Sequence, residues 1–229
     1  MLGPFGVTLV SSRAFNKTWT ILIVALPLAV LAVTVLIALR TGRPIQVFMS
    51  DPRVVDNPHE LTGFASNIGI VLWAAAGFIP LFVGCVRELA TPVDRMLAFF
   101  GAFTLWLMAD DLMLIHEGIL RDLMGIPEEV SFGLYVLIIL GGSFLYRREL
   151  FLQGPLLFVC AGVMFAASIG IDIAPGAIKD SLGQWKVLAE DGAKLLGISL
   201  WAGFFIRAAA RLISLQTDPV LAGSADPAE

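Results

Sequence analysis

Long apolar stretches, separated by short polar or proline-containing stretches, dominate the pattern of the chain. A bilayer core about 30 Å thick needs a helix of roughly 20 apolar residues at a rise of 1.5 Å per residue. Six stretches approach this length, which predicts an all-α integral membrane protein, a compact bundle of six transmembrane helices. The predicted spans are residues 18–39, 61–86, 96–115, 130–146, 151–171 and 187–206.

Turn-forming residues fill the connections between these spans, and no connection is long enough to form a second domain. The chain therefore divides into a short N-terminal segment (residues 1–17), a six-helix transmembrane domain (residues 18–211) and a C-terminal tail (residues 212–229). The end of the tail is rich in Ala, Gly, Ser and Pro, which predicts disorder. Lysines and arginines are somewhat more frequent in the loops on the side of the termini. This bias predicts a multi-pass protein of the cell membrane with both termini in the cytoplasm.

Composition supports the membrane class, with 58% hydrophobic and 15% charged residues in a chain of 229. A formal net charge of −4 argues against nucleic-acid partners, because binding to phosphate backbones requires a basic surface. Cys85 and Cys160 lie far apart in apolar stretches, so neither a disulfide framework nor a thiolate metal site is expected. The expected partners are the lipid bilayer and a lipid or amphiphilic ligand.

Charged side chains inside the apolar spans are the feature that bears on function. The third span contains Asp110 and Asp111, and the sixth contains Glu190, Asp191 and Lys194. Because the spans alternate in direction, these residues fall in the same half of the membrane, the outer half in the predicted orientation. Further polar residues fall in that half or at its surface: Asn67, His116, Glu117, Ser168 and Asp172. The sequence thus predicts one polar pocket, walled by the second, third, fifth and sixth spans.

The energetic cost of this cluster argues that it has a purpose. An ionised side chain at the centre of a span costs about 2.5 to 3.5 kcal/mol, and four carboxylates face one lysine here. A bound divalent metal cation, retained protons or Arg121 could neutralise the excess negative charge. The candidate metal ligands are Asp110, Asp111, Glu117 and Asp191.

Helical periodicity makes three further predictions. Trp106, Asp110, Met113 and Glu117 recur at intervals of four, three and four residues, so they share one helical face. Glu190 and Lys194 are spaced for an ion pair within their own helix. Small residues at positions 162, 166 and 170 predict a close helix contact.

We favour a cation-assisted enzyme, using a metal or a proton, that acts on a lipid or another amphiphile from within the membrane. In this hypothesis His116 transfers protons and Lys194 orients an anionic group. The candidate catalytic residues are Asp110, His116, Glu190 and Lys194, supported by Asn67, Ser168 and Asp172. Two alternatives stay open: a proton-linked transporter or channel, and a non-catalytic membrane subunit whose acids lock helices together.

Overall fold

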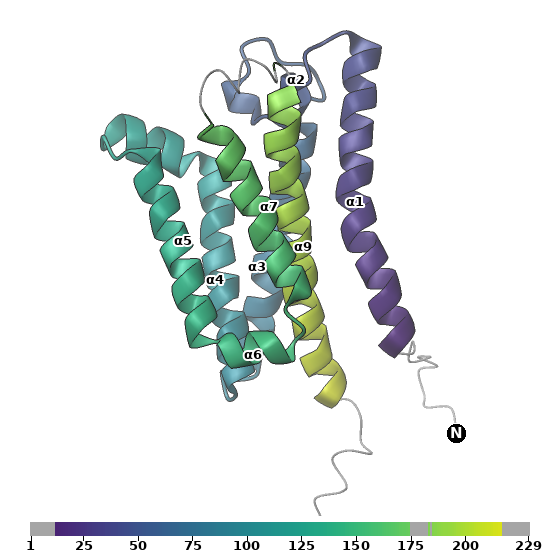
Figure 1. Ribbon diagram of the computed structural model, residues 1–229, viewed down its shortest axis with the longest axis vertical. Coiled ribbons are helices and arrows are strands. Elements are labelled where there is room, and N and C mark those ends of the chain that lie inside the picture. The colour runs from purple at the N-terminus through teal and green to yellow at the C-terminus, as the bar shows by residue number, and fades with distance from the viewer. Residues whose placement is uncertain (1–11, 175–182, 184, 217–229) are drawn as a thin grey trace, which may run out of the picture.

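A computed structural model describes residues 12–174, 183 and 185–216, and this part of the chain is helical without strands. Six long helices lie roughly alongside one another, with α1 at one edge and α5 at the other (Figure 1). They are α1 (Ser12–Thr41), α3 (Phe64–Val86), α4 (Pro92–Met113), α5 (Glu128–Leu145), α7 (Leu156–Asp172) and α9 (Trp185–Gln216). Four short helices join them: α2 (Gln46–Met49), η1 (Pro52–Val54), η2 (Ile115–Leu123) and α6 (Arg147–Leu152).

Within the described residues, five helices are long and apolar enough to cross a membrane, namely α1, α3, α4, α5 and α9. The predicted fifth span, residues 151–171, is divided by a turn at Gly154, which has a positive φ of 79°. The chain before this turn forms α6, and the 17 residues of α7 after it extend only about 26 Å at 1.5 Å per residue. The multi-pass prediction therefore agrees with five helices, whereas α7 is shorter than a full span. The predicted tail begins too early, because α9 continues to Gln216, and residues 217–229 lie outside the described part.

Helix α9 occupies the centre of the bundle, where it contacts α1, α3 and α7. Its Trp201 is fully buried and donates a hydrogen bond from Nε1 to Oγ1 of Thr104 on α4, over 2.9 Å. The ring of Trp201 also packs against Phe100 and Phe158, at centroid distances of 5.7 and 5.2 Å. This aromatic core fixes the positions of α4, α7 and α9 relative to one another.

The closest helix contact joins α3 and α4 through glycine. A Cβ atom at Gly101 would lie 2.7 Å from the Leu81 backbone nitrogen, and one at Gly84 would lie 2.6 Å from the Asp94 carbonyl oxygen. The predicted close contact at the small residues of α7 is wrong, because a Cβ at Gly162 or Gly170 would meet nothing within 4 Å. Glycine on α7 thus leaves open space instead of a tight contact.

Helix α5 is the least embedded of the five candidate spans. It contacts η2 near its start, α6 near its end, and α4 between them, while α7 packs on α9. The space left between α5 and α7 forms one of the two cavities described next.

Candidate functional site

The site begins where α4 ends. Leu114 adopts the left-handed conformation (φ 51°, ψ 46°), which interrupts the helix after Met113, and the chain continues as the π-helix η2. Long π-helices are rare in proteins and occur frequently at functional sites. The expected common face of residues 106, 110, 113 and 117 therefore ends at Met113. Within α4, Asp110 is 4% exposed, whereas Trp106 and Met113 are about half exposed.

This interruption brings His116 back onto Asp110. The His116 backbone N–H donates to Asp110 Oδ1 over 2.9 Å, and His116 Nδ1 lies 2.7 Å from Asp110 Oδ2. Both residues are buried, and the imidazole packs against the Phe132 ring at 5.1 Å. The carboxylate fixes the orientation of the imidazole and stabilises its protonated form.

Two lysines of α9 form ion pairs with three further acids. Lys194 reaches across to α4 and forms an ion pair with Asp111. The expected partner of Lys194, Glu190, instead pairs with Lys186 at 2.8 Å, one helical turn earlier. Lys186 also lies 3.4 Å from Asp172, so it connects α9 to the end of α7.

A cavity of about 500 Å³ lies between α5 and α7, and we call it the apolar cavity. Its walls are aromatic and aliphatic, with Phe132 and Tyr135 from α5 and Phe158 and Phe165 from α7. Charged and polar residues gather at one end of it: Asp110, Asp111, His116, Glu128, Ser168, Asp172, Glu190, Asp191 and Lys194. Its shape and lining suit an amphiphile better than a fully polar solute.

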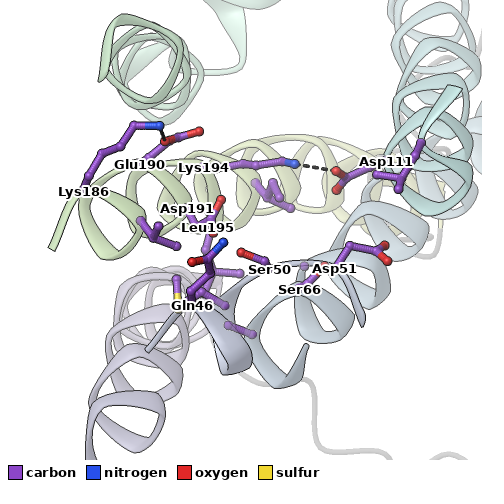
Figure 2. Close-up of a pocket in the computed structure, with 16 residues that line it drawn as sticks. Gln46, Ser50, Asp51, Ser66, Asp111, Lys186, Glu190, Asp191, Lys194 and Leu195 are labelled. Atoms are coloured by element: carbon purple, nitrogen blue, oxygen red, sulfur yellow. Dashed lines mark hydrogen bonds and ion pairs between the residues drawn. The ribbon is translucent and has the colours of Figure 1, made fainter. Parts of the chain in front are cut away.

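A second cavity of about 290 Å³, the polar pocket, lies on the other side of the Lys194–Asp111 pair. Figure 2 shows side chains of α2, α3, α4 and α9 converging on it. Its polar lining consists of Gln46, Ser50, Asp51, Ser66, Asp111, Lys186, Glu190, Asp191 and Lys194. Four of these residues, Asp111, Glu190, Asp191 and Lys194, also line the apolar cavity, so the two cavities share a charged boundary.

Asp51, at the start of η1, is held by Arg53. Its carboxylate accepts hydrogen bonds from the Arg53 backbone N–H, over 2.8 Å, and from the guanidinium, over 3.0 and 2.9 Å. Hydrogen bonding from the Arg53 side chain lowers the pKa of Asp51 below its usual value, against the opposing effect of burial. Asp51 therefore remains an ionised but already paired wall of the polar pocket.

The structure brings most, but not all, of the predicted residues together. Asp110, Asp111, His116, Glu190, Asp191, Lys194, Ser168 and Asp172 line one or both cavities. Asn67 instead lies on an exposed part of α3, outside both cavities, and the side chain of Glu117 is outside the described part. Arg121 pairs with Asp122 and Glu128 at the surface, so it does not neutralise the buried acids.

A metal site receives no support from this arrangement. Among the described residues, no three or more His, Cys, Asp or Glu side chains gather closely enough to hold a metal ion. Asp110 is engaged by His116 and Asp111 by Lys194, so two of the proposed ligands already have partners.

Sequence reasoning missed the contributions of α2 and α5. The apolar cavity takes one wall from α5, which carries Tyr135 in its middle, and the polar pocket takes Gln46 from α2. Tyr135 is the detectable signal, since a tyrosine away from the ends of a span usually has a polar neighbour.

The described residues form a helical bundle of the kind found in multi-pass membrane proteins, with five helices long and apolar enough to cross a membrane and with two cavities that adjoin at partly buried charged residues. The chain belongs to the family described as "Domain of unknown function (DUF8692)", whose model matches residues 21–208. No curated protein and no solved structure matches the chain.

Proposed function

We propose that this protein is a membrane-embedded enzyme that uses His116 to transfer a proton in a reaction of a lipid or another amphiphile. The observation that carries the proposal is the buried Asp110–His116 pair at the polar end of the apolar cavity. An imidazole oriented by a carboxylate is a common general acid or base in enzymes. Here it lies beside a space lined for an apolar chain.

In this proposal the two ends of the apolar cavity have different roles: one binds the hydrocarbon part of the substrate and the other carries out the chemistry. Apolar walls from α5 and α7 accept the hydrocarbon part of the substrate, which gains free energy in proportion to the apolar surface removed from water. Lys194, whose side chain is 40% exposed, supplies a positive charge near His116 that can orient an anionic group. Asp110 holds the imidazole and stabilises the imidazolium that forms when His116 accepts a proton.

Between the two forms of cation assistance predicted from the sequence, the geometry favours the proton. Most acids at the cavity are distributed over separate pairs with His116, Lys186 and Lys194 instead of converging on one point. Such pairs neutralise carboxylates without a metal, and they leave His116 as the group that exchanges protons.

The orientation proposed with this function has both termini in the cytoplasm. The N-terminal end of α1 and the C-terminal end of α9 lie at the same end of the bundle (Figure 1). Helix α2, which contributes to the polar pocket, lies at the opposite end. In this orientation the charged end of both cavities lies toward the outer leaflet. Labelling of single cysteines introduced at positions 56 and 211, in intact cells, tests it.

The chain contains two histidines, which provide a matched test of catalysis. The purified full-length protein in lipid nanodiscs is incubated with total membrane lipid, and products are identified by mass spectrometry. We expect His116→Asn to reduce turnover at least about 100-fold, the usual contribution of a general acid or base. His59→Asn, in a loop outside both cavities, should leave turnover unchanged.

A non-catalytic structural role is the second candidate, because the same contacts connect separate helices. Lys194–Asp111 joins α9 to α4, and Lys186–Asp172 joins α9 to α7. If no lipid is converted by the wild-type protein and His116→Asn changes only thermal stability, this structural role replaces the catalytic proposal.

A further inference from the structure

We infer that the substrate is a zwitterionic lipid whose ammonium group binds Asp191 in the polar pocket while its acyl chains occupy the apolar cavity. This inference rests on the proposed function and specifies its substrate class. It follows from the charges at the boundary between the two cavities, which differ in how far they are neutralised by the protein.

Most charges around the polar pocket are compensated within the protein. Asp111 pairs with Lys194, Glu190 with Lys186, and Asp51 with Arg53. Each of these carboxylates therefore has a basic partner at hydrogen-bonding distance. None of them requires a cation from outside.

Asp191 differs from the other acids. No hydrogen bond or ion pair joins its carboxylate to any residue that the structure describes, yet the residue lines both cavities. The neighbouring Lys194 attracts this carboxylate electrostatically, but the lysine's ion pair is with Asp111. Asp191 is partly buried, and withdrawing a carboxylate from water is costly unless a cation meets it. The carboxylate of Asp191, at the boundary of the two cavities, is thus available to bind a cationic ligand.

The site at Asp191 suits an organic ammonium group better than a metal ion. Ca²⁺ and Mg²⁺ require six or more oxygen ligands, of which a protein site usually supplies several. Here a single uncommitted carboxylate faces a pocket of about 290 Å³, with the amide of Gln46 and the hydroxyls of Ser50 and Ser66 on other walls (Figure 2). One carboxylate is enough to bind an organic ammonium group through its charge, and a primary ammonium also donates hydrogen bonds to such neutral acceptors.

The polar pocket and the apolar cavity adjoin at the residues they share, which makes a lipid the favoured carrier of this ammonium. Lys194 lies at the shared boundary with a partly exposed side chain, so its charge can attract the phosphate that precedes the ammonium in a zwitterionic headgroup. On the other side of the same residue the apolar cavity receives the acyl chains. A lipid bound in this way places its headgroup beside His116, which lines the apolar cavity.

Native mass spectrometry of the purified full-length protein tests the inference with three lipids of identical acyl chains. The probes are phosphatidylethanolamine and phosphatidylcholine, which carry a cationic nitrogen, and phosphatidylglycerol, which does not. We expect the wild-type protein to retain the first two at least about tenfold more than the third. Asp191→Asn, which keeps the size of the side chain, should remove this preference, whereas Asp56→Asn in an exposed loop should preserve it.

A second pair of variants separates this inference from the proposed function. Gly162→Phe fills open space in the apolar cavity, whereas Gly133→Phe adds the same ring on α5 outside it. We expect only Gly162→Phe to reduce retention of all three lipids together. If Gly162→Phe does not reduce lipid retention, the apolar cavity is not the site that binds the acyl chains. Normal lipid retention without a preference for the cationic headgroups, or a preference that persists in Asp191→Asn, overturns only the assignment of Asp191.

Free ethanolamine provides the last arm of the experiment. If it stabilises the wild-type protein against heat as strongly as the lipid does, and Gly162→Phe leaves this effect intact, the ligand is a small amine and the lipid assignment is wrong. If ethanolamine has no effect without acyl chains, the lipid is the source of the ammonium group.

Discussion

His116 Nδ1 lies 2.7 Å from Asp110 Oδ2 because the α-helix between these residues is broken. In a continuous α-helix, side chains six positions apart point in directions that differ by about 120°, at 100° per residue. The left-handed residue Leu114 changes the direction of the chain and lets the imidazole return to the carboxylate. The conformation of one residue in an otherwise apolar segment thus creates the pair on which the proposed chemistry depends.

Asp110→Asn should lower the free energy of unfolding by about 1 to 3 kcal/mol. The substitution weakens a charge-assisted hydrogen bond to His116 in a buried setting and presents an amide N–H₂ where only acceptors were needed. Thermal unfolding of the purified protein in detergent measures the change. Asp122→Asn, on a side chain that is 66% exposed, is the control and should change stability by less than about 0.5 kcal/mol.

Gly101→Ala and Gly162→Ala should have effects of opposite sign. The added methyl at Gly101 meets backbone atoms of α3 at 2.7 and 2.9 Å, so the two helices must separate, at a cost of about 1 to 3 kcal/mol. At Gly162 the methyl meets nothing within 4 Å, and the higher helix propensity of alanine should stabilise the protein by up to about 1 kcal/mol. Equal melting temperatures for the two variants would contradict the described packing of α3 on α4.

The Lys194–Asp111 pair should appear as a coupling energy in a double-mutant cycle. We expect Lys194→Met and Asp111→Asn to be non-additive by about 1 kcal/mol, the upper range for pairs that are partly exposed. Denaturant unfolding in mixed micelles supplies the four stabilities. The cycle of Lys194→Met with Asp56→Asn is the control, and its coupling should be close to zero because Asp56 lies in an exposed loop outside both cavities.

Asp94→Ala should destabilise the protein by about 3 kcal/mol. Asp94 is fully buried, completes the capping box of α4 with Thr91, and accepts a 2.6 Å hydrogen bond from Arg87 Nε. Its removal both weakens the start of the helix and leaves a partly buried guanidinium without this carboxylate. Thr91→Ala removes only the capping hydroxyl and should cost about 1 kcal/mol in the same thermal assay. A smaller effect for Asp94→Ala than for Thr91→Ala would show that the ion pair contributes nothing.

A chelator should leave the thermal stability of the protein unchanged. Asp110 and Asp111, two of the four ligands expected from the sequence, are bound to His116 and Lys194 instead of being available to a metal. Elemental analysis of the purified protein, with melting curves recorded with and without EDTA, measures this. One metal ion per chain, together with a lower melting temperature in EDTA, would restore the metal hypothesis.

The helices were accessible to prediction because apolar length is a strong requirement of the bilayer, and the depth of the acids followed from alternation of the spans. The pairing of the acids was not accessible. Neither glycine nor proline marks the interruption at Leu114, so nothing in the helical period of the sequence signals it. Lys186 lies one residue before the predicted sixth span, yet α9 begins at Trp185 and thus presents Lys186 to Glu190. Helix α5 carries no charge in its middle, so the periodicity of its sequence alone did not predict that it would line the apolar cavity.

The attachment of α5 has a consequence for how a substrate arrives. This helix is held near its two ends by η2 and α6 and along its length by α4, whereas α7 is anchored on α9. A small tilt of α5 would therefore widen the apolar cavity between α5 and α7 without disturbing the glycine contact of α3 with α4. Under the proposed function, a lipid would then enter the apolar cavity directly from the bilayer, without passing through the aqueous phase.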